Sequence, residues 1–141
     1  MGNAEVLPGD LFIFYGLLMP FAKGHPEHLR LYVRGETIGH CAFCAEMFDA
    51  GGYPGVRPSE DDVCAGVLYR LNDTTVLPAL DEFEDCDMSN PDSSLYQRYK
   101  TPFFDGSGRI REGKAWVYWY TAPSSHFSVI EGGEWPREGL S

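Results

Sequence analysis

Glu84 is the side chain in this sequence best suited to acid–base chemistry. The residues Asn72–Thr75 can cap a helix that runs to about Phe83. At about 100° per residue, roughly one third of its circumference holds a group of apolar residues: Val76, Leu77, Leu80 and Phe83. Glu84 falls inside this apolar arc, Asp81 lies at its edge, and Glu82 points the opposite way. Because desolvation disfavours a charged carboxylate, we expect Glu84 to have a pKa raised toward the range of a general base.

Two other placements are open to the Glu84 carboxylate. It can turn into solvent at the end of the helix, or pair with Arg98 or Lys100. Structural ion pairs perturb carboxylates as active sites do, so the residues alone leave the catalytic and structural interpretations open. Arg98 itself is expected in a surface or structural pair.

The cysteine and histidine pairs do not predict a metal site. Cys41 and Cys44 lie in a segment expected to be a strand, where residues three apart point to opposite faces. The two remaining cysteines stand alone. His25 and His28 follow one another across a proline, unlike the i, i+4 histidines of zinc proteases. We therefore expect no bound metal.

Length and charge are those of one small acidic domain. The chain has 141 residues, 43% of them hydrophobic, which is enough for a single domain (1–141) with its own core. A net charge of −10 repels phosphate groups, so nucleic acid and anionic membrane are not expected as partners. The apolar stretch 11–22 is too short to span a bilayer, and the N-terminal residues lack the pattern of a secretory signal. A cytoplasmic location with reduced cysteines is expected, and the oligomeric state is not predicted.

The pattern along the chain predicts an α+β domain. Apolar or alternating segments indicate strands at 11–15, 37–48, 63–71, 96–104 and 115–120. Helices are expected at 26–34 and in the segment before Glu84, where Pro78 is tolerable only in the first turn. About six strands with two short helices favour a mixed sheet that closes toward a small β-barrel.

Seven short motifs follow one another along nearly the whole chain. They are Phe14-Tyr15-Gly16-Leu17-Leu18, Gly52-Tyr53-Pro54-Gly55, Val63-Cys64-Ala65-Gly66-Val67-Leu68-Tyr69, Leu80-Asp81-Glu82-Phe83-Glu84, Tyr96-Gln97-Arg98, Ala115-Trp116-Val117-Tyr118 and Ile130-Glu131-Gly132-Gly133-Glu134-Trp135. Each motif alone is weak, but in this order they resemble the γ-glutamylcyclotransferase-like family, which includes the avirulence-induced proteins of plants.

The resemblance implies a small mixed barrel that needs no cofactor and converts a γ-glutamyl amine into 5-oxoproline and a free amine. It implies that the loop after the first strand cradles the glutamyl group, here through Tyr15, Gly16, Leu17 and Leu18. It also implies that Glu84 carries the proton. Tyr96 is a further candidate for substrate binding, because it begins the Tyr-x-Arg motif of the family.

Two residues depart from the family pattern. Leu17 stands where the family usually has Ser or Thr, so a hydroxyl contact to the substrate is missing. This departure favours the alternative function, a non-catalytic relative that binds a small molecule in the same cavity. Asp85 stands where the family usually has Gly after the catalytic Glu, which can change how the helix ends and where Glu84 points.

Acidic side chains cluster around the proposed site. They are Glu82, Glu84, Asp85, Asp87 and Asp92. A negative field there favours a substrate whose leaving part is cationic, such as a polyamine or an amino sugar. The alternative interpretation is a solvated acidic loop. Several tyrosines are candidates to line the pocket, although each is also explained by packing in a sheet: Tyr15, Tyr53, Tyr96, Tyr118 and Tyr120.

Overall fold

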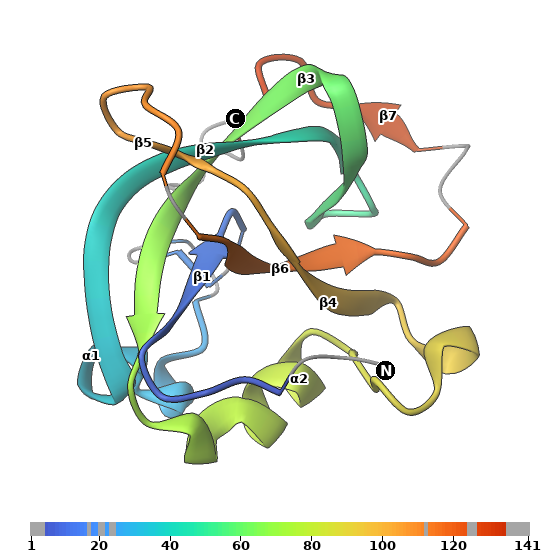
Figure 1. The fold of residues 1–141 in the computed structure, drawn as a ribbon. Coiled ribbons are helices and arrows are strands. Elements are labelled where there is room, and N and C mark those ends of the chain that lie inside the picture. Colours follow the sequence, from blue (N-terminus) through green and yellow to red (C-terminus); the bar gives the residue numbers. More distant parts are fainter. Residues whose placement is uncertain are drawn as a thin grey trace.

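One strongly curved sheet, with helices at one end, makes up the fold (Figure 1). The structure is a computed structural model that describes residues 5–16, 18–19, 22, 25–111, 113–123 and 127–134. Its strands are β1 (Asp10–Phe14), β2 (Gly35–Asp49), β3 (Pro54–Leu71), β4 (Tyr96–Thr101), β5 (Phe104–Asp105), β6 (Ala115–Tyr120) and β7 (Ser128–Val129). Its α-helices are α1 (Leu31–Arg34) and α2 (Leu77–Phe83), and its 3₁₀ turns are η1 (Glu27–Leu29), η2 (Thr74–Val76) and η3 (Pro91–Ser93).

The sheet is mixed but open. The strands follow one another in the order β4-β6-β1-β3-β2-β5, and β7 pairs with β2 outside this path. Neighbouring strands are antiparallel except β1 and β6, which run parallel. The prediction of an α+β fold is therefore confirmed. The expected barrel is too strict a description, because in the described part of the chain the edge strands β4 and β5 do not pair with each other.

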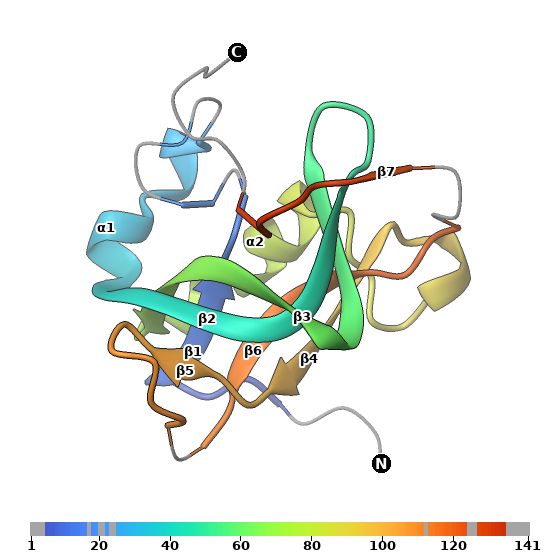
Figure 2. The same ribbon diagram turned by 90° about the horizontal axis from the view of Figure 1, so that it is seen from above.

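Curvature comes mainly from the long hairpin of β2 and β3. The register between these strands shifts between Thr37 and Gly39 and again between Cys44 and Ala45. Such bulges bend a strand and increase its twist, and Figure 2 shows the two strands curling together across β1 and β6. The third strand begins at Pro54, nine residues before its expected start at Val63, because it continues the pairing with β2 up to the turn.

Side chains of the central strands alternate between two apolar clusters. From β1, Phe12 and Phe14 enter the cluster nearest α2, while Ile13 enters the cluster on the other face of the sheet. From β6, Tyr118 enters the first cluster and Val117 the second. Both faces of these strands are buried, as the continuous apolar run of the first strand predicts.

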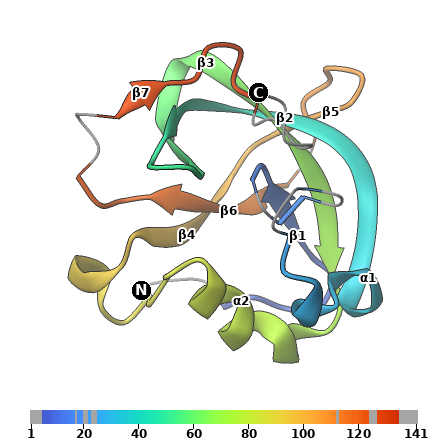
Figure 3. The ribbon, with the colours of Figure 1, turned by 180° about the vertical axis from the view of Figure 1, so that it is seen from behind.

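The helices lie together at one end of the molecule (Figure 1 and Figure 3). The expected helix over 26–34 is divided into η1 and α1, because Arg30 between them adopts a left-handed backbone with φ of 52°. In the second helical segment, the Asp73 side chain accepts a hydrogen bond from the Thr75 amide and caps η2. Pro78 stands in the first turn of α2, as predicted.

The cysteines are placed as isolated thiols. Cys41 is buried and Cys44 is exposed, which agrees with opposite faces of a strand. Among the described residues, no group of three or more potential metal ligands is present. The same part of the chain contains no helix with the length and apolar character needed to cross a membrane.

Gly66 provides a test of the packing between β1 and β3. A methyl group added at this position would lie 2.6 Å from Cγ2 of Ile13 and 3.1 Å from the carbonyl oxygen of Phe14. We expect Gly66→Ala to lower the free energy of unfolding by about 1–3 kcal/mol, because this part of the core cannot accept added volume. Urea unfolding measures the change. Gly106→Ala, in an exposed turn where the nearest atom lies 3.3 Å away, is the control; equal losses in both variants would contradict the prediction.

Candidate active site

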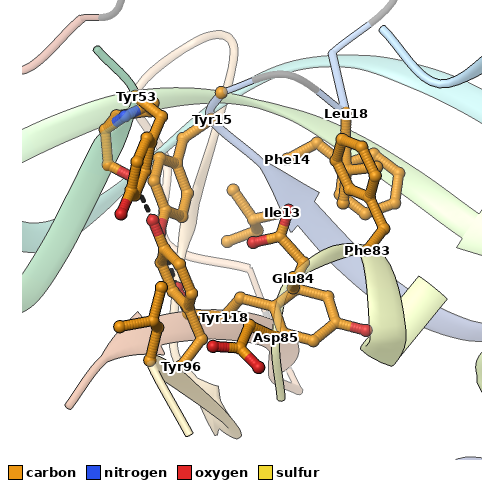
Figure 4. A pocket seen from close by; sticks show the side chains of 13 residues that line it. Ile13, Phe14, Tyr15, Leu18, Tyr53, Phe83, Glu84, Asp85, Tyr96 and Tyr118 are labelled. Atoms are coloured by element: carbon orange, nitrogen blue, oxygen red, sulfur yellow. Dashed lines mark hydrogen bonds between the residues drawn. The ribbon is translucent and has the colours of Figure 1, made fainter. Parts of the chain in front are cut away.

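A cavity of about 320 Å³ lies where β1 ends, between the C-terminus of α2, the β2–β3 turn and the first residues of β4 (Figure 4). Its wall is mainly apolar and aromatic. The residues that line it are Ile13, Phe14, Tyr15, Gly16, Leu18, Tyr53, Pro54, Phe83, Glu84, Asp85, Leu95, Tyr96 and Tyr118. This volume lies at the lower end of the range for small-molecule sites, about 300–1,000 Å³.

Glu84 projects its carboxylate into this cavity. Figure 4 shows the carboxylate directed toward Ile13, in the middle of the space enclosed by the other labelled side chains. Within the part of the chain that the structure describes, no residue forms a hydrogen bond or an ion pair with it. Glu82, two residues earlier, is exposed. The helical periodicity therefore assigned the two side chains to the correct sides.

The environment of Glu84 disfavours its charged form. Burial raises the pKa of Glu84 from 4.5 to about 8, and the nearby negative charge of Asp81 adds to the increase. The residue as a whole is partly exposed, because the cavity opens to solvent. A carboxyl group with this pKa exchanges its proton near neutral pH, which is the property that a general acid and base requires.

The end of α2 fixes the direction of Glu84. Glu84 is the C-cap residue, and Asp85 after it has a left-handed backbone with φ of 52°. The Cys86 amide donates to the Asp81 carbonyl at 2.9 Å, and the Asp85 amide donates to the Glu82 carbonyl at 3.1 Å. These two bonds form a Schellman motif. Asp85 thus takes the conformation that glycine adopts most easily, and the helix ends in the usual way despite the departure from the family pattern.

Asp81 is the structural acid of this helix. Its two carboxylate oxygens accept hydrogen bonds from Arg98 at 2.9 and 2.8 Å, and one of them also accepts a bond from the Tyr118 hydroxyl at 2.6 Å. Arg98 is therefore engaged with Asp81, as its expected structural role requires. The amino group of Lys100 lies 5.2 Å above the ring of Trp116. A pair between Glu84 and either cation, which the sequence left open, is not formed.

The loop after β1 reaches the cavity through Tyr15, Gly16 and Leu18. The Tyr15 hydroxyl donates to the Tyr118 carbonyl at 2.6 Å, so this side chain joins β1 to β6 as well as lining the wall. A methyl group on Gly16 would lie 2.6 Å from Cγ of Pro54, which explains the need for glycine. The Met19 amide donates to the Gly16 carbonyl at 3.0 Å and closes the turn. Leu17 lies outside the described residues, so its role as a substrate contact stays a prediction.

Tyr96 lines the cavity on the side opposite Phe83. Its hydroxyl donates to the Pro54 carbonyl at 2.6 Å, which ties β4 to the start of β3. Tyr53 and Tyr118 are also in the wall, whereas Tyr120 packs edge-on against Tyr96 at 5.1 Å between ring centroids. Several lining residues were not predicted as site residues: Ile13, Phe14, Pro54, Phe83 and Leu95. Three of them stand in the quoted motifs, but their apolar character matches that of core residues and does not indicate a place in a cavity.

The chain belongs to the γ-glutamyl cyclotransferase, AIG2-like family, whose sequence profile matches residues 12–137. No curated protein has a significantly similar sequence. This is the family that the order of motifs along the chain resembles.

Solved structures of similar fold support the architecture. An AIG2-like protein from Mus musculus superposes with a TM-score of 0.64 at 19% identity, covering 96% of this chain and 100% of that one. A protein described as a gamma-glutamyl cyclotransferase superposes with a TM-score of 0.55 at 16% identity, and the match covers 86% of this chain and 69% of that one. YkqA from Bacillus subtilis superposes with a TM-score of 0.62 at 22% identity. That match covers 90% of this chain but only 39% of the longer protein. At these identities the likeness concerns the fold.

The raised pKa of Glu84 predicts a pH-dependent cost in stability. The unfolded chain ionises this group near pH 4.5, whereas the folded protein retains the proton until about pH 8, so the wild type loses stability as pH rises between these values. Glu84→Gln removes the charge, and we expect it to raise the free energy of unfolding by about 1–4 kcal/mol at about pH 9 and by little at about pH 4. Urea unfolding at both pH values measures the difference.

Glu82→Gln is the matched control for that experiment, because the same change is made on the exposed side of the helix. It is expected to leave the stability nearly unchanged at both pH values. A Glu84→Gln variant that is no more stable than the wild type at high pH would show that the carboxylate is well solvated.

The left-handed backbone at Asp85 predicts which substitutions the helix end tolerates. Asp85→Gly and Asp85→Asn keep access to this conformation, so the free energy of unfolding should change by less than about 0.5–1 kcal/mol. Asp85→Val should cost about 1–2 kcal/mol more, because a β-branched side chain is strained there. Thermal or urea unfolding of the three variants makes the comparison, and equal stabilities would contradict the assignment of the motif.

Proposed function

We propose that this protein is a cyclotransferase that releases 5-oxoproline and a free amine from a γ-glutamyl amine or γ-glutamyl amino compound. The observation that supports the proposal most directly is the Glu84 carboxylate, which points into the cavity at the end of β1 without a partner among the described residues. Membership of the family supports the same class of reaction.

The reaction needs only one proton carrier, because the substrate contains its own nucleophile. Folding of the glutamyl chain brings the α-amino nitrogen to the γ-carbonyl carbon, and such an intramolecular step gains greatly from orientation. The Glu84 carboxylate accepts a proton from the attacking amine as the new C–N bond forms. It then delivers a proton to the leaving nitrogen as the old C–N bond breaks. The reaction involves no oxidation or reduction, and Glu84 ends in the protonation state in which it began.

The apolar wall suits this chemistry. A glutamyl chain held against Ile13, Phe14 and Phe83 is shielded from water, which favours ring closure over hydrolysis. The described residues that line the cavity include no Lys, Arg or His. The substrate carboxylate and the developing oxyanion are therefore assigned to backbone amides of the loop after β1, whose turn is closed by the bond from Met19 to Gly16.

Production of 5-oxoproline from a panel of γ-glutamyl amines, amino acids and isopeptides tests the proposal. We expect Glu84→Gln to lower kcat/KM by about 10²–10⁴-fold, the usual effect of removing a general acid–base group. Glu82→Gln should stay within about twofold of the wild type, since this exposed side chain does not line the cavity. Wild-type kcat/KM should also rise with pH through about 8, as Glu84 loses its proton.

The alternative is a protein that binds a γ-glutamyl compound without converting it, which the departure at Leu17 favours. Equal rates for the wild type and Glu84→Gln, or no 5-oxoproline from any compound that binds, would leave this alternative and reject the catalytic proposal.

A further inference from the structure

The acidic side chains around the cavity have very different positions. Glu82 and Asp92 are exposed and do not line the cavity. The Asp87 carboxylate accepts hydrogen bonds from the Ser89 amide at 3.0 Å and the Ser89 hydroxyl at 2.6 Å, so it stabilises its own turn. Of these acids, only Glu84 and Asp85 contribute to the wall. Of the acids named from the sequence, the two that line the cavity are therefore neighbours in the chain, and Asp85 is the one of them that is exposed.

Asp85 lies at the solvent side of the cavity. The residue is exposed, whereas Ile13, Tyr15 and Tyr118 in the same wall are buried. Figure 4 shows its carboxylate on the side of Tyr96, whereas the Glu84 carboxylate points toward Ile13. No described residue forms a hydrogen bond or an ion pair with this carboxylate, so its charge is not neutralised by another side chain.

The backbone of Asp85 is held in a defined place. Its amide donates to Glu82, and its carbonyl accepts from the amide of Leu95 at 3.0 Å and, more weakly, from that of Tyr96 at 3.4 Å. The residue is thus attached both to the end of α2 and to the start of β4. These bonds fix the backbone of Asp85, so its side chain starts from a defined point on the cavity rim.

The proposed reaction determines which part of the substrate meets Asp85. Glu84 must reach both the attacking and the leaving nitrogen, since it moves a proton between them. With the glutamyl portion placed at the buried end beside β1, as the proposed function requires, the leaving portion would extend past Glu84 toward solvent and along Asp85. In the described wall, no cation competes for the Asp85 carboxylate.

We propose that Asp85 makes this cavity selective for γ-glutamyl amines whose leaving portion carries a second, positively charged amino group. This inference rests on the proposed function of the cavity and specifies its substrate class. A leaving portion that ends in a carboxylate, such as an amino acid or a peptide, is disfavoured by the same charge. Asp85 acts by attraction at the rim and takes no part in proton transfer.

Three substrates of matched length isolate this charge. They are the γ-glutamyl monoamide of 1,4-diaminobutane, the γ-glutamyl amide of pentylamine, which replaces the ammonium by a methyl group, and the γ-glutamyl amide of 4-aminobutanoate, which carries a carboxylate. We expect the wild type to favour the cationic over the neutral substrate by about two- to fivefold in kcat/KM, as for a partly solvated ion pair. The preference should fall toward one at about 0.5 M salt.

Asp85→Asn removes the charge and keeps a side chain that tolerates the left-handed backbone, so the ratio of the two rates should approach one. Glu82→Gln makes an equal change of net charge on the outer face of α2 and should leave the ratio as in the wild type. Equal ratios in the wild type and Asp85→Asn would overturn the inference. So would an equal loss in both variants, because the preference would then arise from the overall charge.

Binding distinguishes the failure of this inference from the failure of the proposed function. Calorimetry with Glu84→Gln, which leaves the substrates intact, should give the same preference for the cationic compound, and Glu84→Gln with Asp85→Asn should lose it. If no 5-oxoproline forms but the preference in binding persists, the catalytic proposal fails and the role of Asp85 stands. If none of the compounds binds, or all bind equally well, the role of Asp85 is rejected.

Discussion

The ion pair between Asp81 and Arg98 holds together the elements that surround the cavity. Asp81 belongs to α2, Arg98 to β4, and the Tyr118 hydroxyl that completes the arrangement belongs to β6. A bidentate pair with a third donor leaves both carboxylate oxygens satisfied, and such satisfied networks define one geometry. The C-terminus of α2 is thereby fixed against the sheet, and the position of Glu84 three residues later follows from it.

The two acids of α2 have opposite environments. Asp81 is surrounded by donors, whereas Glu84 faces apolar and aromatic side chains and has its pKa raised to about 8. A buried carboxyl group without a partner and with a strongly raised pKa, in a cavity, is a common feature of functional sites. The Schellman motif at Asp85 makes this arrangement possible by turning the chain directly after Glu84.

Part of the site was accessible from local periodicity, because the apolar arc of α2 separates Glu84 from Glu82. The loop after the first strand, which the resemblance to the family indicated, does reach the cavity at Tyr15, Gly16 and Leu18. The term barrel was too strict for the open sheet, and the helix expected over 26–34 is divided into η1 and α1. Whether a sheet closes depends on which edge strands pair, and this is a long-range property. The helix is interrupted at Arg30, whose left-handed backbone cannot be predicted from its residue type.

By itself, the sequence determined the class of fold, the side of α2 on which Glu84 lies and the strands that bury both faces, since each follows from spacing along a few neighbouring residues. Only the tertiary structure decided which side chains form hydrogen bonds with one another. Arg98 donates to Asp81, 17 residues earlier in the chain, and the Tyr118 hydroxyl donates to Asp81 across 37 residues. The Tyr15 hydroxyl donates to the Tyr118 carbonyl across 103 residues. Such contacts depend on strand order and register, which no local pattern encodes, and they distinguish Asp81, which pairs with Arg98, from Glu84, which lines the cavity.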